Sequence, residues 1–236
     1  MKPTKVTFTG IDERTDVKRL VRLQKKYPFV EFGVLTSYNW DKNGNRYLPP
    51  QLIPSLHGCG LNLSLHLCGS LAHDAAEGCW NRVNHHVCNS LDAFKRVQLN
   101  VAQRSDNPIR IASTPNRHTE LIIQQTADNT SLYEASAWVC CGSTGGVSLL
   151  LDASGGRGID TPLEVWESTG KIGYAGGFNP DNIAEKLSFL MQNIRKGEFW
   201  IDMESGVRSD DWLDLDKVEQ VLVICDYLIK LYSLSK

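Results

Sequence analysis

Three glycine-containing turns in the C-terminal half of the chain each follow a short apolar run. They are "LLLDASGGRG" at 149–158, "IGYAGGFNP" at 172–180 and "DMESGV" at 202–207. Glycine lets the backbone approach a bound group closely while its N–H groups stay exposed, and such loops commonly hold phosphate. The alternative is that these glycines only permit tight turns. We predict a phosphate site formed by Gly155, Gly156, Gly176, Gly177, Ser205 and Gly206.

A second set of residues with possible chemistry is rich in histidine and cysteine and lies within 57–88. Imidazole and thiolate are common zinc ligands, and this segment contains two H-x-C patterns and one H-H-x-C pattern. No C-x-x-C pair occurs, and alternation along a strand is not the spacing of a zinc knuckle, so we predict no metal site. A zinc protein stays open as an alternative. Its ligands would come from His57, Cys59, His66, Cys68, Cys79, His85, His86 and Cys88.

Short apolar runs along the whole chain are candidates for the strands that position these residues. Several are followed by segments with helical periodicity. Strand followed by helix, repeated, favours parallel pairing, and eight such units are typical of the (β/α)8 barrel, or TIM barrel. We predict one α/β barrel domain over residues 1–236, with an irregular His/Cys-rich region at about 57–95; an open doubly wound sheet is the alternative. The runs are 5–10, 29–35, 61–69, 96–101, 120–126, 147–152, 171–177 and 198–204.

Capping residues indicate where two of the helices begin. Asn179 followed by Pro180 predicts a helix start whose unpaired N–H groups add to the phosphate site. Asp216 with Glu219 predicts an acidic capping box at the last helix. For the less regular segment 70–95 we expect one helix with an enlarged loop.

The composition excludes several classes of partner. The chain has 236 residues and a formal net charge of −2, which gives no electrostatic basis for binding nucleic acid or an anionic membrane. The N-terminal segment lacks the apolar stretch of a signal peptide, and the apolar segment 218–234 is interrupted by Asp226 and Lys230. With seven cysteines and no sign of export, we expect free thiols. We therefore expect a cytoplasmic monomer or homodimer.

The order and spacing of the motifs resemble the phosphoribosylanthranilate isomerase family. The three glycine-containing turns are similar to that family's C-terminal half. "VTFTGI" at 6–11 is similar to its opening strand, which typically reads V-K-I-C-G-I, and "SYNWDKNGNRYLPP" at 37–50 to its second loop. The resemblance runs from end to end, with weak matches at 57–95 and 103–146. It implies an Amadori rearrangement, which opens a ribose ring and moves a proton from C2 to give an aminoketose.

This reaction needs a general acid at the ring oxygen and a general base at C2. The resemblance implies that Asp152 is the acid and that Arg46 contacts the aglycone of the substrate. The alternatives are an Asx turn at Asp152 and a solvated loop charge at Arg46. The family's base is a cysteine of the first strand, and Thr9 stands in its place. Because a threonine hydroxyl is a very weak base, we assign Thr9 to substrate binding.

Three further residues are candidates for the missing base or for the cavity wall. Asp12 lies just beyond the first strand, and the alternative is that it caps the following helix. Cys68 shares a strand face with His66, because the two are two residues apart, and a nearby imidazole can lower the pKa of a thiol. The alternative there is a packed cysteine and a satisfied histidine. Glu204 is predicted to bind substrate.

The sequence therefore predicts a barrel enzyme that isomerises a ribose-phosphate-containing substrate by general acid–base catalysis, without a cofactor. The changed base favours a substrate that differs from that of the family. We expect the ligand to be a small phosphorylated sugar or a nucleotide-like molecule. One alternative is a catalytically silent barrel that binds such a ligand, and a second is a zinc-dependent barrel enzyme.

Overall fold

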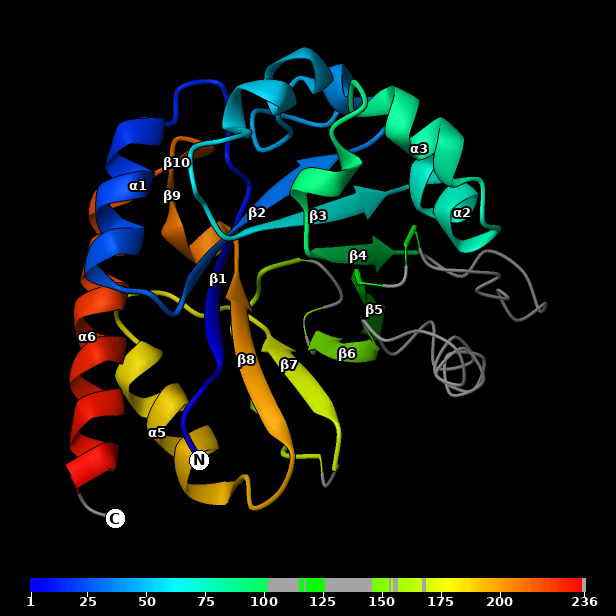
Figure 1. The fold of residues 1–236 in the computed structure, drawn as a ribbon. Coiled ribbons are helices and arrows are strands. Elements are labelled where there is room, and N and C mark those ends of the chain that lie inside the picture. The colour runs from blue at the N-terminus through cyan, green and yellow to red at the C-terminus, as the bar shows by residue number, and fades with distance from the viewer. Residues whose placement is uncertain are drawn as a thin grey trace.

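A computed structural model describes residues 1–234 apart from 102–114, 117, 126–145, 153, 155–156 and 167–168. Eight parallel strands close into a barrel in their sequence order (Figure 1). All eight predicted strands and the (β/α)8 barrel are confirmed. The strands are β1 (Lys5–Thr9), β2 (Val30–Thr36), β3 (Leu63–Cys68), β4 (Arg96–Asn100), β5 (Glu120–Gln125), β6 (Val147–Asp152), β7 (Lys171–Ala175) and β8 (Glu198–Met203).

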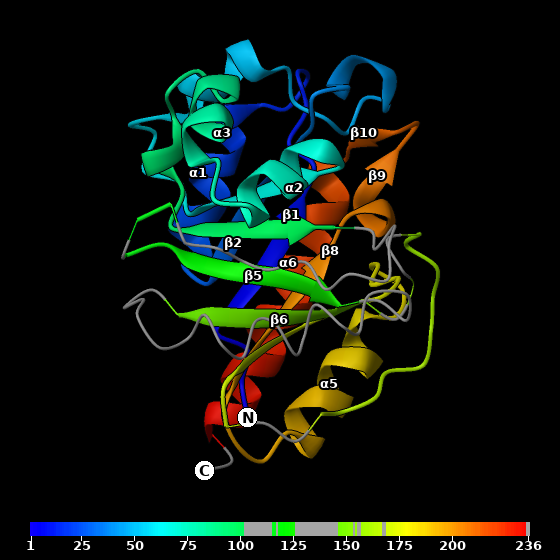
Figure 2. The ribbon, with the colours of Figure 1, turned by 90° about the vertical axis from the view of Figure 1, so that its right-hand side faces the viewer.

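Helices pack on the outside of the barrel. In Figure 1, α1 (Val17–Lys26), α5 (Ile183–Asn193) and α6 (Leu215–Leu234) lie on one side, while α2 (Ser70–Ala76) and α3 (Trp80–His86) lie beside β3 and β4. After a turn of 90°, β5 and β6 face the viewer, away from α1 and α6 (Figure 2). Short 3-10 helices occupy Trp40–Lys42, Pro50–Leu56, Leu91–Ala93 and Ser205–Val207.

The irregular His/Cys-rich region contains two short helices, so the prediction of one helix with an enlarged loop is wrong. The chain turns after α2 at Gly78, whose φ of 81° lies in the left-handed region that glycine adopts without strain. A residue in this conformation ends a helix, because the next backbone N–H groups bond back to the last carbonyls. Here the N–H of Gly78 donates to the carbonyl of Ala75 at 3.0 Å.

The last helix is capped by Asp214 and not by the predicted acidic capping box. The Asp214 carboxylate accepts the N–H groups of Asp216 and Lys217 at 2.9 and 3.2 Å. The side chains of Asp216 and Glu219 instead accept hydrogen bonds from Arg19 of α1, at 2.5 and 3.3 Å. Before α6 the chain forms a small antiparallel ribbon of β9 (Arg208–Ser209) and β10 (Trp212–Leu213).

Side chains of the strands alternate between two cores. The outward-facing ones, such as Phe8 and Phe32, join the helices in the main apolar core. Inside the barrel, a smaller apolar cluster consists of Ile122, Leu150 and Trp200. Most other inward-facing residues near the carboxyl ends of the strands are polar, which leaves functional groups around the mouth.

Gly173 of β7 makes room for the indole of Trp200, and its replacement tests the inner cluster. A Cβ atom at Gly173 would overlap the Trp200 ring and lie 2.6 Å from Cδ1 of Leu150. We expect Gly173→Ala to lower the free energy of unfolding by about 1–3 kcal/mol through overpacking, measured by urea denaturation. The double variant Gly173→Ala/Trp200→Phe should lose less than the sum of the two single variants. If the losses of unfolding free energy in the two single variants simply added up in the double variant, the result would contradict this packing.

Candidate functional site

The loops that follow β6, β7 and β8 are in mutual contact at the mouth of the barrel. A Cβ atom at Gly206 would overlap the carbonyl oxygen of Phe178, and one at Gly158 would lie 2.5 Å from Oγ of Ser205. A Cβ at Gly177 would lie 2.5 Å from the backbone of Asp160. Glycine at these positions therefore allows three neighbouring turns to meet.

Backbone donors are available where these turns meet. In the described part of the chain, the N–H groups of Gly176, Gly177, Ser205 and Gly206 have no acceptor within the protein. All four residues line one cavity. Their assignment to phosphate binding remains a prediction. Gly155 and Gly156, which belong to the same prediction, lie outside the described residues.

The predicted contribution of a helix start at Asn179 is wrong. The helix α5 begins at Ile183, and a turn precedes it. The Asn179 side chain accepts the N–H groups of Asp181 and Asn182 at 2.9 and 3.1 Å, and the Asn179 carbonyl accepts that of Ile183 at 3.0 Å. These donors are used within the protein, so they are not available to an anion.

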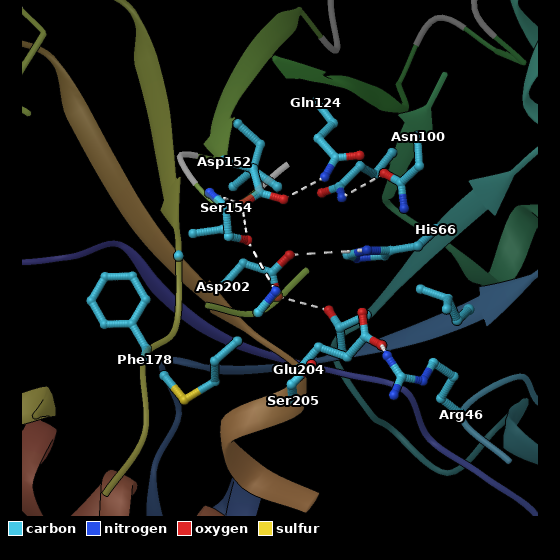
Figure 3. A pocket seen from close by; sticks show the side chains of 18 of the residues that line it. Arg46, His66, Asn100, Gln124, Asp152, Ser154, Phe178, Asp202, Glu204 and Ser205 are labelled. Atoms are coloured by element: carbon cyan, nitrogen blue, oxygen red, sulfur yellow. Dashed lines mark hydrogen bonds and ion pairs between the residues drawn. The ribbon is translucent and has the colours of Figure 1, made fainter. Parts of the chain in front are cut away.

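The cavity at the carboxyl ends of the strands has a volume of about 230 Å³. Its wall combines the glycine turns with carboxylate, amide and hydroxyl side chains, among them Asp152, Gln124 and Ser154 (Figure 3). In barrels of this type, ligand sites lie at this end. The polar side chains in the wall are Thr9, Arg46, Tyr47, His66, Cys68, Gln98, Asn100, Gln124, Asp152, Ser154, Asp202, Glu204 and Ser205.

Asp152 lies in the cavity wall at the end of β6 and accepts three hydrogen bonds from residues that the structure describes. Its Oδ1 accepts the N–H and the hydroxyl of Ser154 at 3.0 and 2.7 Å, and its Oδ2 accepts Nε2 of Gln124 at 2.7 Å (Figure 3). The Asx-type contact considered as the alternative is therefore present. That contact uses Oδ1, while Oδ2 accepts the hydrogen bond from Gln124 of the neighbouring strand β5. The carboxyl group therefore stays in the wall of the cavity.

Asp202 of β8 lines the cavity and was not among the residues predicted from the sequence. Its carboxylate lies inside the barrel mouth and is only 6% exposed. Oδ1 accepts the hydroxyl of Thr9 at 2.7 Å, and Oδ2 lies 4.0 Å from Nδ1 of His66. Burial raises the pKa of Asp202 to about 7, because the charged form loses its hydration; the Thr9 hydrogen bond acts in the opposite direction. A carboxyl group with this pKa exists in both protonation states near neutrality.

A signal for Asp202 is present in the sequence. It is an acidic residue within the apolar run "EFWIDM" of 198–203. Because side chains alternate along a strand, Asp202 and Trp200 share a face, which here is the inside of the barrel. Glu204, two residues further on, lines the same cavity.

The prediction that His66 lowers the pKa of Cys68 is wrong. His66 exchanges a hydrogen bond with the Ser64 hydroxyl at 2.9 Å, and burial lowers its own pKa to about 3, so its ring is neutral. Cys68 lines the cavity and accepts Nδ2 of Asn100 at 3.3 Å, but burial raises the pKa of its thiol to about 11. Cys68 is therefore a protonated thiol near neutrality and not a thiolate base.

The alkylation rates of individual cysteines test this conclusion. We expect iodoacetamide at pH 8 to modify Cys68 much more slowly than Cys88, because only the thiolate reacts and Cys88 is exposed. The rates can be measured by mass spectrometry of peptides from the native protein. Denatured protein serves as the control, since both residues should then react at similar rates. A faster reaction of Cys68 in the native protein would contradict the raised pKa.

Arg46 lines the cavity from the loop after β2, with both terminal guanidinium nitrogens engaged. Nη1 donates to Oε1 of Glu204 at 2.7 Å (Figure 3). Nη2 donates to Oδ1 of Asp211 at 2.9 Å. Burial raises the pKa of Glu204, and the nearby Arg46 opposes this shift. The two predicted substrate-binding residues thus form an ion pair with each other at the rim.

Asp12 does not line the cavity, so the prediction of Asp12 as general base is wrong. Its Oδ2 accepts Nη2 of Arg208 at 3.0 Å and the N–H of Leu213 at 2.6 Å, and its Oδ1 accepts the N–H of Arg14 at 3.1 Å. These contacts join the end of β1 to the β9–β10 ribbon. The role of Asp12 is structural.

The residues considered as zinc ligands are not brought together. His57 contacts the carbonyl of Ser90 at 3.3 Å, and His86 contacts the hydroxyl of Thr36 at 3.0 Å. Among the residues that the structure describes, the only group of three with metal-ligand spacing is Asp74, Glu77 and Cys79. One member of that group, Asp74, already accepts hydrogen bonds from Tyr38 and Arg82.

Comparison with known proteins supports the fold. No protein-family model and no curated protein matches the sequence. The solved structure of N-(5'-phosphoribosyl)anthranilate isomerase from Pyrococcus furiosus is 13% identical, covers 95% of this chain and 99% of its own, and has a TM-score of 0.53. That of phosphoribosyl anthranilate isomerase from Thermococcus kodakaraensis is 15% identical, with coverages of 94% and 98% and a TM-score of 0.53.

At these identities the likeness shows the fold alone. It confirms that the chain resembles phosphoribosylanthranilate isomerases in fold, as the motifs indicated. Separately, no described helix is both long and apolar enough to cross a membrane.

Proposed function

We propose that this barrel isomerises a small ribose-phosphate-containing substrate by general acid–base catalysis of the Amadori type. The observation that carries the proposal is the contact between Asp202 and Thr9, at 2.7 Å. Thr9 stands where the first strand of the isomerase family has its base. A carboxylate whose pKa is raised to about 7 therefore lies beside that position and replaces the missing cysteine as base.

The phosphate end of the substrate is assigned to the turns at 176–177 and 205–206. Their N–H groups, which have no acceptor among the described residues, support this assignment, because such donors bind an anion without a nearby cationic side chain. With the phosphate held there, the ribose lies over Asp202 and Asp152, which line the same cavity.

The reaction then proceeds in two proton transfers. Asp152 donates a proton to the ring oxygen as the C1–O bond breaks, and the nitrogen lone pair forms an iminium group at C1. Asp202 removes the proton from C2, and the electrons of that C–H bond form the enaminol, which tautomerises to the aminoketose. Each carboxyl group supplies or accepts one proton, so the reaction needs no external oxidant or reductant.

A catalytically silent binding barrel is the second candidate. It is favoured by Thr9 and by the contacts of Ser154 and Gln124 with Asp152, which use both carboxylate oxygens. The enzyme and the silent binding barrel differ in one measurable result, the turnover of the bound ligand. A ligand would bind in both cases, but only the enzyme would convert it to the aminoketose.

The test is an assay of N-(5'-phosphoribosyl)anthranilate and related aminoaldose phosphates with the wild type and Asp152→Asn. We expect turnover of at least one of these compounds, and about a 10²–10⁴-fold loss in the variant, the usual contribution of one general acid. Equal activity of the two proteins would remove Asp152 from catalysis. Binding without any turnover in the wild type would favour the silent barrel.

A further inference from the structure

Gln98 of β4 has a buried side-chain oxygen, Oε1, with no hydrogen-bond donor in the part of the chain that the structure describes. The residue is 3% exposed and lines the cavity. Buried acceptors without a donor are uncommon in native proteins because their desolvation is not compensated. One that faces a binding cavity is therefore well suited to accept a hydrogen bond from a ligand.

The hydrogen bonds of the neighbouring amides leave the oxygen end of Gln98 free. Nε2 of Gln98 donates to Oδ1 of Asn100 at 2.9 Å, and Nδ2 of Asn100 donates to Sγ of Cys68 at 3.3 Å. Gln98 and Asn100 thus each donate an amide N–H group to the next residue in a row of hydrogen bonds. Oε1 of Gln98 lies at the start of this row and accepts no hydrogen bond from it. This corner of the cavity presents an acceptor.

The charges around the cavity disfavour an anionic group at this end of a ligand. Among the residues that the structure describes, three carboxyl groups line it, those of Asp152, Asp202 and Glu204, against one guanidinium group. That guanidinium, of Arg46, is already bonded to Glu204 and Asp211 at 2.7 and 2.9 Å. His66 adds no positive charge because burial holds its pKa at about 3. A ligand carboxylate would meet acidic groups and an occupied arginine.

The position of β4 fits the far end of a phosphate-anchored ligand. In the closed order β1 to β8, strand β4 stands opposite β8. The turns assigned to phosphate follow β7 and β8. A ligand anchored there extends across the mouth, past Asp202, toward Gln98 and Asn100.

We propose that the substrate carries a neutral hydrogen-bond donor, such as a carboxamide, on the nitrogen-linked group of its ribose, and that Gln98 Oε1 accepts this donor. The group is not an aryl carboxylate. The inference rests on the proposed function, since it takes the phosphate end of the ligand from it. Gln98 is then a specificity-determining residue, and the Arg46–Asp211 contact adds to the selection against a carboxylate.

Nicotinamide mononucleotide and nicotinic acid mononucleotide form a matched pair of probes. They share the ribose 5-phosphate and differ only in a carboxamide against a carboxylate. Ribose 5-phosphate tests the phosphate site alone. By titration calorimetry with the wild-type protein we expect all three to bind, and the carboxamide to bind about tenfold more tightly than the carboxylate.

Two variants and a matched control separate the contributions. Gln98→Met removes the acceptor with little change in volume and should reduce the preference for the carboxamide several-fold. Gln125→Met is the control, because Gln125 also has a buried Oε1 with no partner among the described residues but does not line the cavity, and it should leave the preference unchanged. Asp211→Asn removes a charged partner of Arg46, so it should strengthen binding of the carboxylate probe. The ratio of carboxamide to carboxylate affinity should then become smaller.

Several results of these binding measurements would overturn the inference about Gln98. Equal or tighter binding of the carboxylate by the wild type overturns the inference, and so does the absence of binding by both mononucleotides while ribose 5-phosphate binds. An unchanged ratio in Gln98→Met, in protein that still binds ribose 5-phosphate, also overturns it. If Gln98→Met fails to fold, the test rests on the ratio of carboxamide to carboxylate affinity in the wild type and on the change of this ratio in Asp211→Asn. No binding of ribose 5-phosphate overturns the proposed phosphate site, and this inference with it.

Discussion

Asp202→Asn should lower the turnover of an aminoaldose phosphate by about 10²–10⁴-fold, the usual contribution of one general base. Asparagine keeps the shape and can still accept the hydroxyl of Thr9, which lies 2.7 Å from Oδ1. It cannot accept the proton from C2. The loss should appear in kcat, while the affinity for ribose 5-phosphate changes little because the phosphate is assigned to backbone N–H groups of the turns at 176–177 and 205–206 and not to the Asp202 side chain. Turnover close to that of the wild type would exclude Asp202 as the base.

The pH profile gives an independent measurement of the same group. As a base, Asp202 acts in its ionised form, so kcat/KM of the wild type should rise with pH through an apparent pKa near 7. Thr9→Val removes the hydrogen bond that opposes the upward shift, so the profile should move to higher pH. A threonine with a purely structural role would leave the midpoint unchanged. The isosteric change is mild enough to retain the fold.

The same carboxyl group should destabilise the folded protein at higher pH. Its pKa is about 7 in the folded state and near its ordinary value of 3.8 in the unfolded state. Between these values the folded state binds more protons, so the free energy of unfolding falls as the pH rises from about 4 to about 7. Asp202→Asn should abolish this contribution and make the protein more stable than the wild type at pH 7 and above.

The strands were predictable because each is a short apolar run that the barrel buries, and the order of strands in such a barrel follows the order in the chain. The position of the glycine turns followed from the same reasoning. Once the strands are placed, the turns at 176–177 and 205–206 must meet at the mouth. Alternation along β3 likewise placed Cys68 in the cavity wall.

The chemistry of individual side chains was harder to predict because it depends on contacts between distant segments. Thr9 and Asp202 are 193 positions apart and meet only because β1 and β8 close the barrel. The sequence places His66 near Cys68, but it does not show that burial makes the imidazole neutral and the thiol protonated. Asn179 looked like a helix cap, and whether its own turn consumes the N–H groups depends on the local backbone.

Asp12→Ala should cost about 3–5 kcal/mol of unfolding free energy, because it removes the nearest carboxylate from the buried Arg208 and leaves Asp211, 3.7 Å from Nε, as its ion-pair partner. The Arg208 guanidinium is 4% exposed and the Asp12 side chain 1%. Burial already lowers the pKa of Arg208, and Asp12 is the strongest group that opposes this shift. The variant also loses the acceptor for the Leu213 N–H, so the β9–β10 ribbon should detach from β1. Guanidinium chloride unfolding measures the loss.

The exposed pair of Asp226 and Lys230 on α6 provides the control. Its atoms lie 2.6 Å apart, but the Lys230 side chain is 71% exposed, so Asp226→Ala should cost no more than about 1 kcal/mol. The comparison also separates two roles for Asp12. If Asp12 were the general base, Asp12→Ala would keep its stability and lose turnover. If Asp12 is structural, the opposite pattern is expected. Little of the Asp12→Ala variant should be folded at 37 °C, and at lower temperatures, where it is folded, its kcat/KM should keep the pH dependence set by Asp202.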